Sequence, residues 1–477
     1  MTPADRRTGH VPSGAARPPA RRGGRSVRDR RTFTIVGLCV AVTAIAFESI
    51  SVATAMPAAA RKLDGFDLYA WAFSMFLVGQ LFATVTAGRL CDRIGPAWPM
   101  TVGLGLFSTG LVVGATAVTM LQLVAGRLLQ GLGAGTIGIS LYVVIALAFE
   151  PTQRPTVFSF FSTAWVLPSF VGPTIAAWLT HRLGWQAVFW TVLPLVALGA
   201  AMTLPLVFGL PRPATEADEE RRTRPTTLWA AGLAAVGTVA LQVAGQRPSV
   251  AGALAGATGL LMVGVSLPNL MPSGFFRFRP GLAPVITVRG LMAGAFFGAE
   301  AFVPLMLVEQ RHLSLLAAGS TLTIGALGWT AGSWTQSRPR LPLRRDQLVL
   351  AGAASLLLGL ALVTLVTATR LWVGLVAVGW VLTGVGMGLA TASTAVATMA
   401  LSESAEQGRN ASSLQFAEAF GAGLVVGGGG TVFAALRHTG TATSVFTAVL
   451  GSMTLVGVLA VLAAVRTGPI RDTSSSG

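Results

Sequence analysis

The chain has 477 residues, of which 53% are hydrophobic and only 11% charged, and its mean hydropathy is +0.68. One water-soluble core cannot bury so much apolar surface, so the composition excludes a soluble globular protein and predicts an all-α protein that crosses the membrane many times. The net charge of +16 would suggest a nucleic-acid partner in a soluble protein, but most Lys and Arg residues lie in the amino-terminal tail and in alternate loops, so we expect no nucleic acid to bind.

Residues 1–31 hold nine arginines among Pro, Gly and Ala and show no apolar periodicity. We expect a disordered basic tail near anionic lipid head groups. The pair Arg30-Arg31 before an apolar run also resembles a twin-arginine export signal, but the run at 33–57 has the length of a membrane span and contains Glu48, which favours a span. A second disordered tail is expected at residues 467–477.

Fourteen apolar runs follow, in groups of six, two and six. The first half, residues 32–210, contains runs at 33–57, 68–88, 98–119, 121–148, 156–180 and 186–209. Residues 211–280 form a polar linker and an inserted two-helix hairpin, with runs at 227–246 and 250–270. The second half, residues 281–466, contains runs at 284–308, 313–336, 347–367, 371–400, 412–436 and 442–466. The pattern predicts fourteen transmembrane helices.

The distribution of positive charge tests this count. With the amino terminus inside, 26 of the 34 Lys and Arg residues lie on the inner side, seven lie in outer loops, and Arg127 lies within a span. Because inner loops of membrane proteins carry an excess of Lys and Arg, this topology predicts that both termini are cytoplasmic.

An internal repeat supports two related halves. The segment from Gly126 to Gly135 aligns with the segment from Gly379 to Gly388 at an offset of 253 residues, with glycines matched along it. The fourth and twelfth spans are therefore predicted to be equivalents in two related halves. Parallel repeats of this kind are typical of transporters whose halves rock against each other around a substrate bound near mid-membrane.

A charged segment, Gly88-Arg89-Leu90-Cys91-Asp92-Arg93-Ile94-Gly95, separates the second and third apolar runs. We expect a short turn at the bilayer surface whose charges pair with each other or with helix ends. It resembles the G-x-L-x-D-R-x-G signature of the major facilitator superfamily, which implies the major facilitator fold and a conformational latch. Its predicted members are Gly88, Arg89, Asp92, Arg93 and Gly95.

Glu48 lies inside the first apolar run, nine positions before Pro57 in a Met-Pro pair. A charge within a span costs about 2.5 to 3.5 kcal/mol on insertion scales, so it needs a reason to be there. The run resembles the first-span motif of the fourteen-span drug:proton antiporters of that superfamily. A carboxyl group in an apolar cavity exchanges a proton more readily near neutral pH, and it can attract a cationic substrate in competition with that proton. The alternative is a permanently protonated or structural Glu48.

Arg127 lies in Gly126-Arg127-Leu128-Leu129-Gln130-Gly131, which resembles the R-x-x-Q-G motif of the same antiporters. A guanidinium stays charged whatever its surroundings, so Arg127 can tune a neighbouring carboxyl, and we expect Glu48 to be its partner. The alternative is an arginine that extends to the nearby membrane interface.

Glu300 and Glu418 are the other acids within apolar runs. Glu300 nearly mirrors Glu48 at an offset of 252 and is predicted to bind protons or substrate. Glu418 lies near the cytoplasmic end of its run, where it either has the same role or pairs with an arginine of a loop.

The fifth run contains Gly172-Pro173 and an earlier proline, Pro168. A proline inside a helix removes a backbone hydrogen bond, and the adjacent glycine lets another helix approach. The segment resembles the G-x-x-x-G-P-x-x-G-G motif of the antiporters and so implies export.

The remaining residues exclude several other functions. The sole lysine, Lys62, lies outside any phosphate-binding loop, and two cysteines make neither a disulfide framework nor a metal site. The four histidines form no paired catalytic motif, which argues against a membrane-embedded enzyme. We expect a monomeric antiporter of the bacterial inner membrane that exports small amphipathic molecules, with protons as the energy source and no cofactor. A lipid or glycolipid exporter of the same fold is the alternative, and a scaffold without transport would not need three buried acids.

Overall fold

The computed structural model describes residues 23–149, 154–210, 226–246, 249–338, 343–369, 371–403 and 406–470. These ranges contain fourteen α-helices and two short 3-10 turns, η1 (Phe66–Leu68) and η4 (Phe275–Arg277). The first six helices are α1 (Gly23–Lys62), α2 (Trp71–Ile94), α3 (Ala97–Ala115), α4 (Met120–Ala148), α5 (Arg154–Leu183) and α6 (Gln186–Val207). Two more are α7 (Thr226–Gln246) and α8 (Val250–Leu270). The last six are α9 (Leu282–Glu309), α10 (Leu315–Gln336), α11 (Arg345–Ala368), α12 (Leu375–Ala400), α13 (Gln407–Leu436) and α14 (Ala442–Val465).

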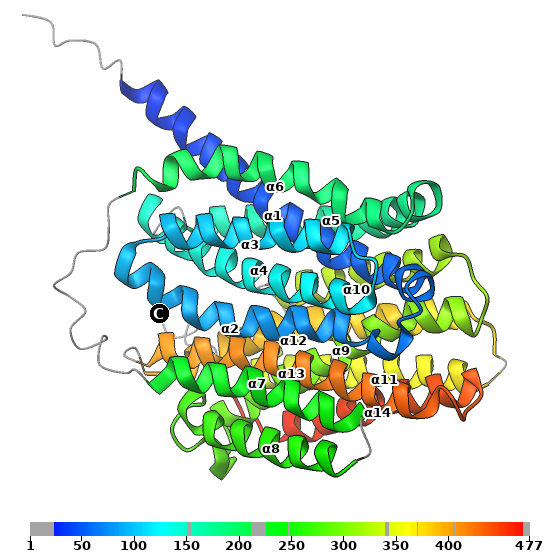
Figure 1. Ribbon diagram of the computed structural model, residues 1–477. Coiled ribbons are helices and arrows are strands. Elements are labelled where there is room, and N and C mark those ends of the chain that lie inside the picture. Colours follow the sequence, from blue (N-terminus) through cyan, green and yellow to red (C-terminus); the bar gives the residue numbers. More distant parts are fainter. Residues whose placement is uncertain are drawn as a thin grey trace, which may run out of the picture.

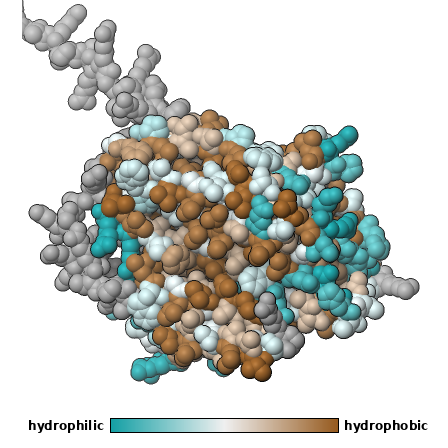
Figure 2. Space-filling model, viewed as in Figure 1, coloured by the Kyte–Doolittle hydropathy of each residue, from teal (hydrophilic) through white to brown (hydrophobic). Residues whose placement is uncertain are grey.

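The helices lie side by side, and successive helices run in opposite directions (Figure 1). We call the end of the bundle where α1 begins and α14 ends the terminal side, and the other end the far side. Figure 2 shows apolar side chains across the middle of one face, with hydrophilic residues gathered at its two ends. Such a band is the surface that a bilayer requires.

Among the described residues, twelve helices are long and apolar enough to cross a membrane. The two helices outside this count are α5, of which several side chains lie outside the described part of the chain, and α10, which is rich in Ser, Thr and Gly. Both pack within the same bundle as the others, and they contact each other. The predicted count of fourteen spans is therefore not established by composition and remains a proposal.

The same packing pattern occurs twice. In the first half, α4 packs on α2 and α3, α1 packs on α5 and α6, and α3 packs on α6. In the second half, α12 packs on α10 and α11, α9 packs on α13 and α14, and α11 packs on α14. Two seams join the halves, one between α2 and α13 and one between α5 and α10. The repeat matches α2 with α10 and α13 with α5, so each seam is the equivalent of the other. The predicted repeat is thus present in the packing of the helices.

The matched glycines explain why the repeat is visible in the sequence. A Cβ atom at Gly131 would collide with the carbonyl oxygen of Phe76 on α2, and one at Gly384 would collide with that of Gly325 on α10. Gly133 and Gly386 meet α3 and α11 in the same way. Close approach of helix backbones in lipid requires small residues, so each half keeps its glycines at the same helix crossings.

The structure differs from the expected boundaries in two places. The first helix begins at Gly23, inside the predicted tail of residues 1–31, because no proline follows Pro19 there and a helix already formed in the membrane extends easily. The rest of the tail, the whole 211–225 linker and residues 471–477 lie outside the described residues. The predicted turn at Gly88–Gly95 is largely helical, since α2 continues to Ile94 and only Gly95, with φ of 80°, leaves the helix.

Candidate functional site

A buried ion pair lies inside the first half, midway along the bundle. Glu48 of α1 is 0% exposed and Arg127 of α4 is 3% exposed, and the Nη1 atom of Arg127 donates a hydrogen bond to Oε1 of Glu48. The sequence predicts this pairing, and the alternative of an arginine that extends to the membrane interface is wrong because Arg127 is buried. The roles of the two residues in proton and substrate binding stay predictions.

Arg127 is fixed by three further contacts. Its Nε atom donates to the carbonyl oxygen of Ala72 on α2 at 2.8 Å, and Nη1 also donates to Oε1 of Gln130 at 2.6 Å. Its guanidinium lies 4.4 Å from the centre of the Phe76 ring. Arg127 therefore joins α1, α2 and α4, and Gln130 is a member of the site that the motif contained but to which the sequence assigned no role.

Two polar atoms of this site are buried without a hydrogen-bond partner in the described part of the chain: Oε2 of Glu48 and Nε2 of Gln130. Buried polar atoms are nearly always satisfied, so an exception at a charged site calls for an explanation. One oxygen of Glu48 is thus held by Arg127, while the other is available to a proton or a ligand.

Two polar contacts join α5 to α1, and Pro168 explains the first of them. Pro168 has no N–H group, so the carbonyl oxygen of Ala164 loses its helical donor, and the hydroxyl of Thr43 on α1 donates to it at 3.3 Å. Eight residues further along both helices, the hydroxyl of Ser51 donates to the carbonyl oxygen of Gly172 at 3.4 Å. The Gly172-Pro173 motif is therefore placed against α1 near Glu48.

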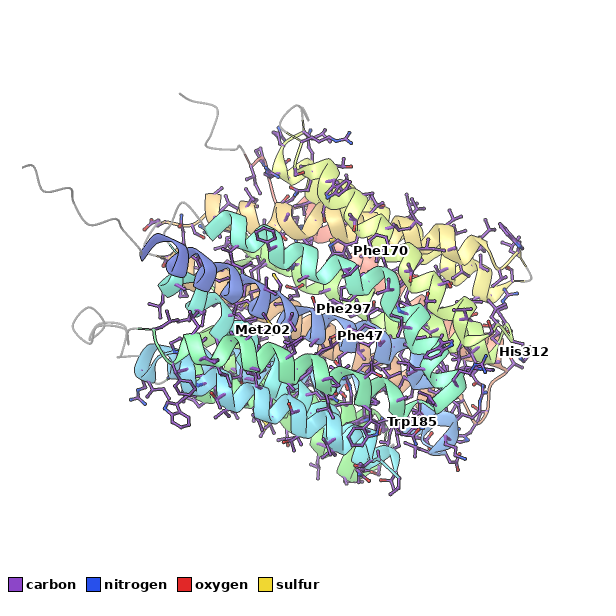
Figure 3. The ribbon with its side chains drawn as sticks, turned by 90° about the horizontal axis from the view of Figure 1, so that it is seen from above. Phe47, Phe170, Trp185, Met202, Phe297 and His312 are labelled. Carbon is purple, nitrogen blue, oxygen red and sulfur yellow. The ribbon has the colours of Figure 1, made fainter. Side chains whose placement is uncertain are left out.

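Gly172-Pro173 also lies at the seam between the halves. A Cβ atom at Gly319 of α10 would come within 3.3 Å of Pro173 and 2.9 Å of Thr54 on α1. Figure 3 shows Phe47, Phe170 and Phe297 midway along the bundle, where α1, α5 and α9 run. The motif thus belongs to the region where the two halves meet, although its predicted link to export is a separate matter.

Glu300 lies in α9 between two buried alanines and is itself partly buried. No hydrogen bond or ion pair joins it to another described residue.

The predicted mirror relation of Glu300 to Glu48 is not kept in three dimensions. Asp64 and His312 follow the far ends of α1 and α9, and both adopt a positive φ, of 45° and 54°. These two residues are 248 positions apart, and the same offset matches Glu48 with Phe296. Glu300 therefore lies one helical turn nearer the far side than the position that matches Glu48.

Glu418 of α13 forms an ion pair at 2.7 Å with Arg289 of α9. The sequence allowed for such a pair with a loop arginine, but Arg289 lies within its helix and is only 7% exposed. Arg289 also donates to the carbonyl oxygen of Thr391 on α12 at 2.6 Å. It joins three helices near the terminal side. The signal that could have found it is a charge inside the apolar run at 284–308.

The predicted latch residues lie at the terminal end of α2. Arg93 is exposed, and Cys91 is buried with its Sγ atom 3.6 Å from Oγ of Ser140 on α4. A Cβ atom at Gly88 would meet Ile139 only at 4.0 Å, so close packing does not require a glycine there. The latch itself stays a prediction, and the side chain of Asp92 lies outside the described residues.

Contacts between the halves close the far side of the bundle. Arg61 at the end of α1 pairs with Glu309 at the end of α9, and Asp67 of η1 lies 3.2 Å from Arg437 at the end of α13. Nearer the middle of the bundle, the hydroxyl of Tyr69 donates to the carbonyl oxygen of Ala301 at 2.7 Å. The rings of Tyr69, Phe302 and Phe433 pack together there.

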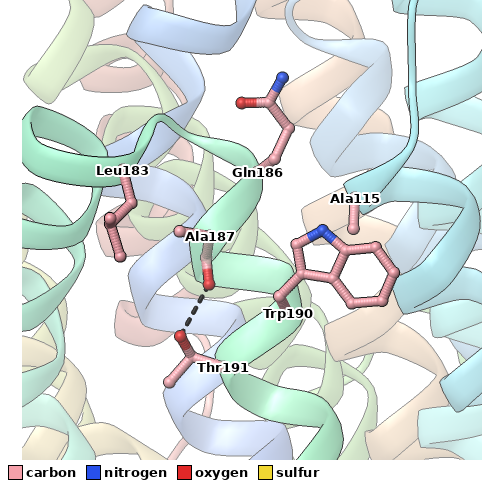
Figure 4. A pocket seen from close by; sticks show the side chains of 6 residues that line it. All are labelled: Ala115, Leu183, Gln186, Ala187, Trp190 and Thr191. Carbon is pink, nitrogen blue, oxygen red and sulfur yellow. Dashed lines mark hydrogen bonds between the residues drawn. The ribbon is translucent and has the colours of Figure 1, made fainter.

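A hollow of about 680 Å³ lies elsewhere, at the far ends of α3, α5 and α6. Figure 4 shows its walls, including Trp190 and Thr191, whose hydroxyl donates to the carbonyl oxygen of Ala187 at 2.7 Å. None of the candidate residues lines it. We therefore place the candidate site at the buried acids between the helices.

Known proteins resemble this chain along most of its length. A probable multidrug-efflux transporter of Mycobacterium tuberculosis is 27% identical over 419 residues, which cover 84% of this chain and 88% of that protein. The methylenomycin A resistance protein of Streptomyces coelicolor is 29% identical over 66% of this chain and 68% of its own length. The multidrug efflux pump SdrM of Staphylococcus aureus is 22% identical over 69% of this chain and 74% of its own length.

Solved structures share the arrangement of the helices. A transporter of the POT family in complex with 5-aminolevulinic acid has a TM-score of 0.67 at 15% identity, over 91% of this chain and 95% of that one. A bacterial homologue of the lysosomal transporter Spinster, in an inward-facing and unoccupied conformation, has a TM-score of 0.62 at 13% identity, over 92% of this chain and 96% of that one. At these identities the likeness concerns the fold.

The sequence model of the Major Facilitator Superfamily matches residues 36–426, which include the buried ion pair, the Gly172-Pro173 motif and most of both halves. The apolar helices and the bacterial efflux relatives agree with a multi-pass protein of the cell membrane. The chain belongs to the Major Facilitator Superfamily, as a transporter with multidrug-efflux relatives.

Proposed function

We propose that this transporter is a proton-coupled antiporter that exports small amphipathic compounds by alternating access. The observation that carries the proposal is the ion pair of Glu48 and Arg127, because a charged carboxylate buried in a membrane helix is costly and marks proton or substrate pathways. The efflux relatives support the direction and the substrate class.

In the proposed membrane arrangement all fourteen helices span the bilayer, and the terminal side faces the cytoplasm. The excess of Lys and Arg on that side supports this orientation. Residues 32–210 and 281–466 act as the two moving halves, and residues 211–280 form the insert between them. The protein works as a monomer, uses the proton gradient without ATP or a cofactor, and has no enzymatic activity.

The proposed coupling step takes place at Glu48. A proton from the far side binds Oε2, the oxygen that Arg127 does not hold, and neutralises the carboxylate. The electrostatic attraction between Glu48 and Arg127 is then lost, which changes how α1 is held against α4. A cationic substrate competes with the proton for the same negative charge. Binding of one therefore favours release of the other, which is the requirement for antiport.

Two further acids have proposed supporting roles. Glu300 has no partner among the described residues and is partly exposed, so it is free to meet a substrate or a second proton. Glu418 is already paired with Arg289, so we assign it to substrate binding on the cytoplasmic side only when that pair opens. The contacts of Arg61 with Glu309 close the far side, which suits a state that loads substrate from the cytoplasm.

The experiment uses purified protein in liposomes with an imposed pH gradient, and follows the movement of a panel of lipophilic cations. Glu48→Gln removes the charge with little change in volume, and Glu406→Gln is the matched control because Glu406 pairs with Arg409 on the surface at 42% exposure. We expect gradient-driven transport by the wild type and the control, and at least a tenfold loss in Glu48→Gln.

Other outcomes redirect the proposal. Normal transport by Glu48→Gln would make Glu48 structural, and Glu300→Gln would then be the variant to measure. If the wild type moves no cation but translocates a fluorescent lipid, the protein is a lipid exporter of the same fold.

A further inference from the structure

The inserted hairpin lies against one of the two seams between the halves. Helix α7 packs on α2 of the first half and on α13 of the second half, and α8 packs mainly on α7 (Figure 1). α7 therefore lies along the α2–α13 seam, with α8 outside it.

One residue of α7 makes polar contacts with both halves. Gln242 is 3% exposed and accepts a hydrogen bond at 2.7 Å from the hydroxyl of Ser74 on α2, which is 0% exposed. Its Nε2 atom donates to the carbonyl oxygen of Gly423 on α13 at 3.4 Å. A Cβ atom at Gly427 would collide with the side chain of Gln242, so the glycine in α13 provides the space that Gln242 occupies.

These contacts lie toward the far side, where the halves are closed. One turn beyond Gln242, the side chain of Gln246 donates to the carbonyl oxygen of Asp67 at 3.4 Å, and Asp67 in turn pairs with Arg437. Toward the terminal side, the contacts of the described α7 side chains are apolar. Ala230 and Ala234 pack there in a cluster with Leu81 of α2 and Ala417 of α13. Small apolar side chains can slide past one another, whereas hydrogen bonds must break.

The other seam has no such cover in the described residues. It is the α5–α10 seam, where Thr323 donates to the carbonyl oxygen of Phe170 at 3.4 Å. Because the repeat exchanges the two seams, the hairpin is what makes them different.

We propose that α7 is a clasp across the α2–α13 seam, which stabilises the state closed on the far side through the two hydrogen bonds of Gln242. Opening of the far side moves α2 away from α13, so Gln242 must release Ser74 or Gly423. A hydrogen bond within the membrane contributes on average about 0.6 kcal/mol, which corresponds to about a threefold change in population. Loss of both bonds corresponds to about tenfold. This proposal rests on alternating access, as proposed above.

The test measures how often the far side opens. Thr54 of α1 is 1% exposed and lies against Gly319 of α10 in the far half of the bundle. Thr54→Cys is introduced into a chain with Cys39→Ser and Cys91→Ser, and the protein is placed in lipid nanodiscs. Thr54 lies beside the other seam, the one between α5 and α10, so it reports opening of the far side as a whole. The rate at which a water-soluble maleimide modifies this cysteine is proportional to the population in which the far side is open.

Gln242→Leu removes both hydrogen bonds at similar volume. Thr238→Val is the matched control, because Thr238 lies one turn away in α7, is 1% exposed, and donates only within its own helix to Ala234. We expect a three- to tenfold faster modification in Gln242→Leu and less than a twofold change in Thr238→Val. Thermal unfolding of each variant identifies loss of folding.

Equal rates in Gln242→Leu and Thr238→Val would overturn the clasp. Gradient-driven transport is measured on the same variants, so that failure of the clasp is distinguished from failure of the proposed antiport. If the wild type transports and the two rates are equal, the antiport stands and the clasp is wrong. If the wild type does not transport but the rates differ as expected, the clasp stands without the antiport.

Discussion

Phe296 stacks on Trp380, with ring centres 5.3 Å apart and an angle of 20° between the rings, at the place where the other half holds Glu48 and Arg127. Trp380 matches Arg127 at the offset of 253 that relates α4 to α12, and Phe296 matches Glu48 at the offset of 248 that relates α1 to α9. Two helices that are joined by an ion pair in the first half are joined by aromatic stacking in the second. The two halves therefore share the arrangement of their helices, but different side-chain interactions join the equivalent helices.

This difference predicts that substitutions at the matched residues Trp380 and Arg127 affect different properties, stability in one case and the response to a pH gradient in the other. Trp380→Ala should leave a cavity in the second half, since Trp380 is 1% exposed, and should lower stability by about 3 kcal/mol without abolishing the response to a pH gradient. Arg127→Ala should abolish that response. Thermal unfolding and gradient-driven transport, measured side by side, check both. A Trp380→Ala protein that folds but no longer responds to the gradient would contradict the division of roles.

Removal of one partner of the buried pair should cost more than removal of both. Arg127→Leu leaves Glu48 uncompensated in the bundle, where breaking a buried pair typically costs about 3 to 5 kcal/mol. The double variant with Glu48→Gln has no uncompensated charge, so it should regain most of the stability and still fail to couple transport to the gradient. Unfolding temperatures of the two single variants and the double variant measure this. A double variant no more stable than Arg127→Leu would show that Glu48 is already neutral in the folded protein.

Much of the fold follows from the sequence because the bilayer limits the choice of structure. The apolar runs predict the helices, and the offset of the Gly126 and Gly379 segments predicts which helices are equivalent. The length of α1 beyond its apolar run was not predictable, since a helix can continue into polar sequence. The same holds for α2, which continues to Ile94 through charged residues that also suit a helix.

Within the candidate site, the sequence predicts Glu48 and Arg127 because a charge within an apolar run stands out. It does not predict their neighbours, because Ser74, Gln242 and Thr43 are polar residues of kinds that are common in membrane helices. Their role depends on which helices meet in the folded protein, and the helices that meet are far apart in the sequence. The predicted mirror relation of Glu48 and Glu300 is not kept, because the second half has Phe296 at the position that matches Glu48 and Glu300 lies one helical turn away.

The repeated glycines predict equal effects in the two halves. Gly131→Ala and Gly384→Ala each place a methyl group against a backbone carbonyl oxygen of the neighbouring helix, which cannot move away like a flexible side chain. Each should lower stability by about 1 to 3 kcal/mol. Gly138→Ala is the control in the same helix as Gly131, because nothing lies within 4 Å of its Cβ position. Thermal unfolding compares the three, and a loss in Gly138→Ala equal to the others would refute the packing explanation.

The carbonyl freed by Pro168 predicts an interaction between two substitutions. Thr43→Val removes the hydroxyl that donates to the carbonyl oxygen of Ala164, and this should cost about 0.6 kcal/mol. When Pro168→Ala restores the helical N–H donor, the hydroxyl is no longer needed, so Thr43→Val should then cost little. The coupling energy from a double-mutant cycle measures this, and a value near zero would mean that Thr43 does not compensate for the proline.

The two glycines of the predicted latch should behave differently. Gly95 has φ of 80° and ψ of 171°, a conformation open to glycine alone, so Gly95→Ala should destabilise the end of α2 by about 1 to 3 kcal/mol. Gly88 lies inside α2 with open space around its Cβ position, so Gly88→Ala should leave stability unchanged or raise it by up to about 1 kcal/mol. A latch that depends on bending at Gly88 would be stiffened by this change. Slower transport by a Gly88→Ala protein of full stability would therefore support a moving latch, whereas unchanged transport would confine the segment to a structural role at the end of α2.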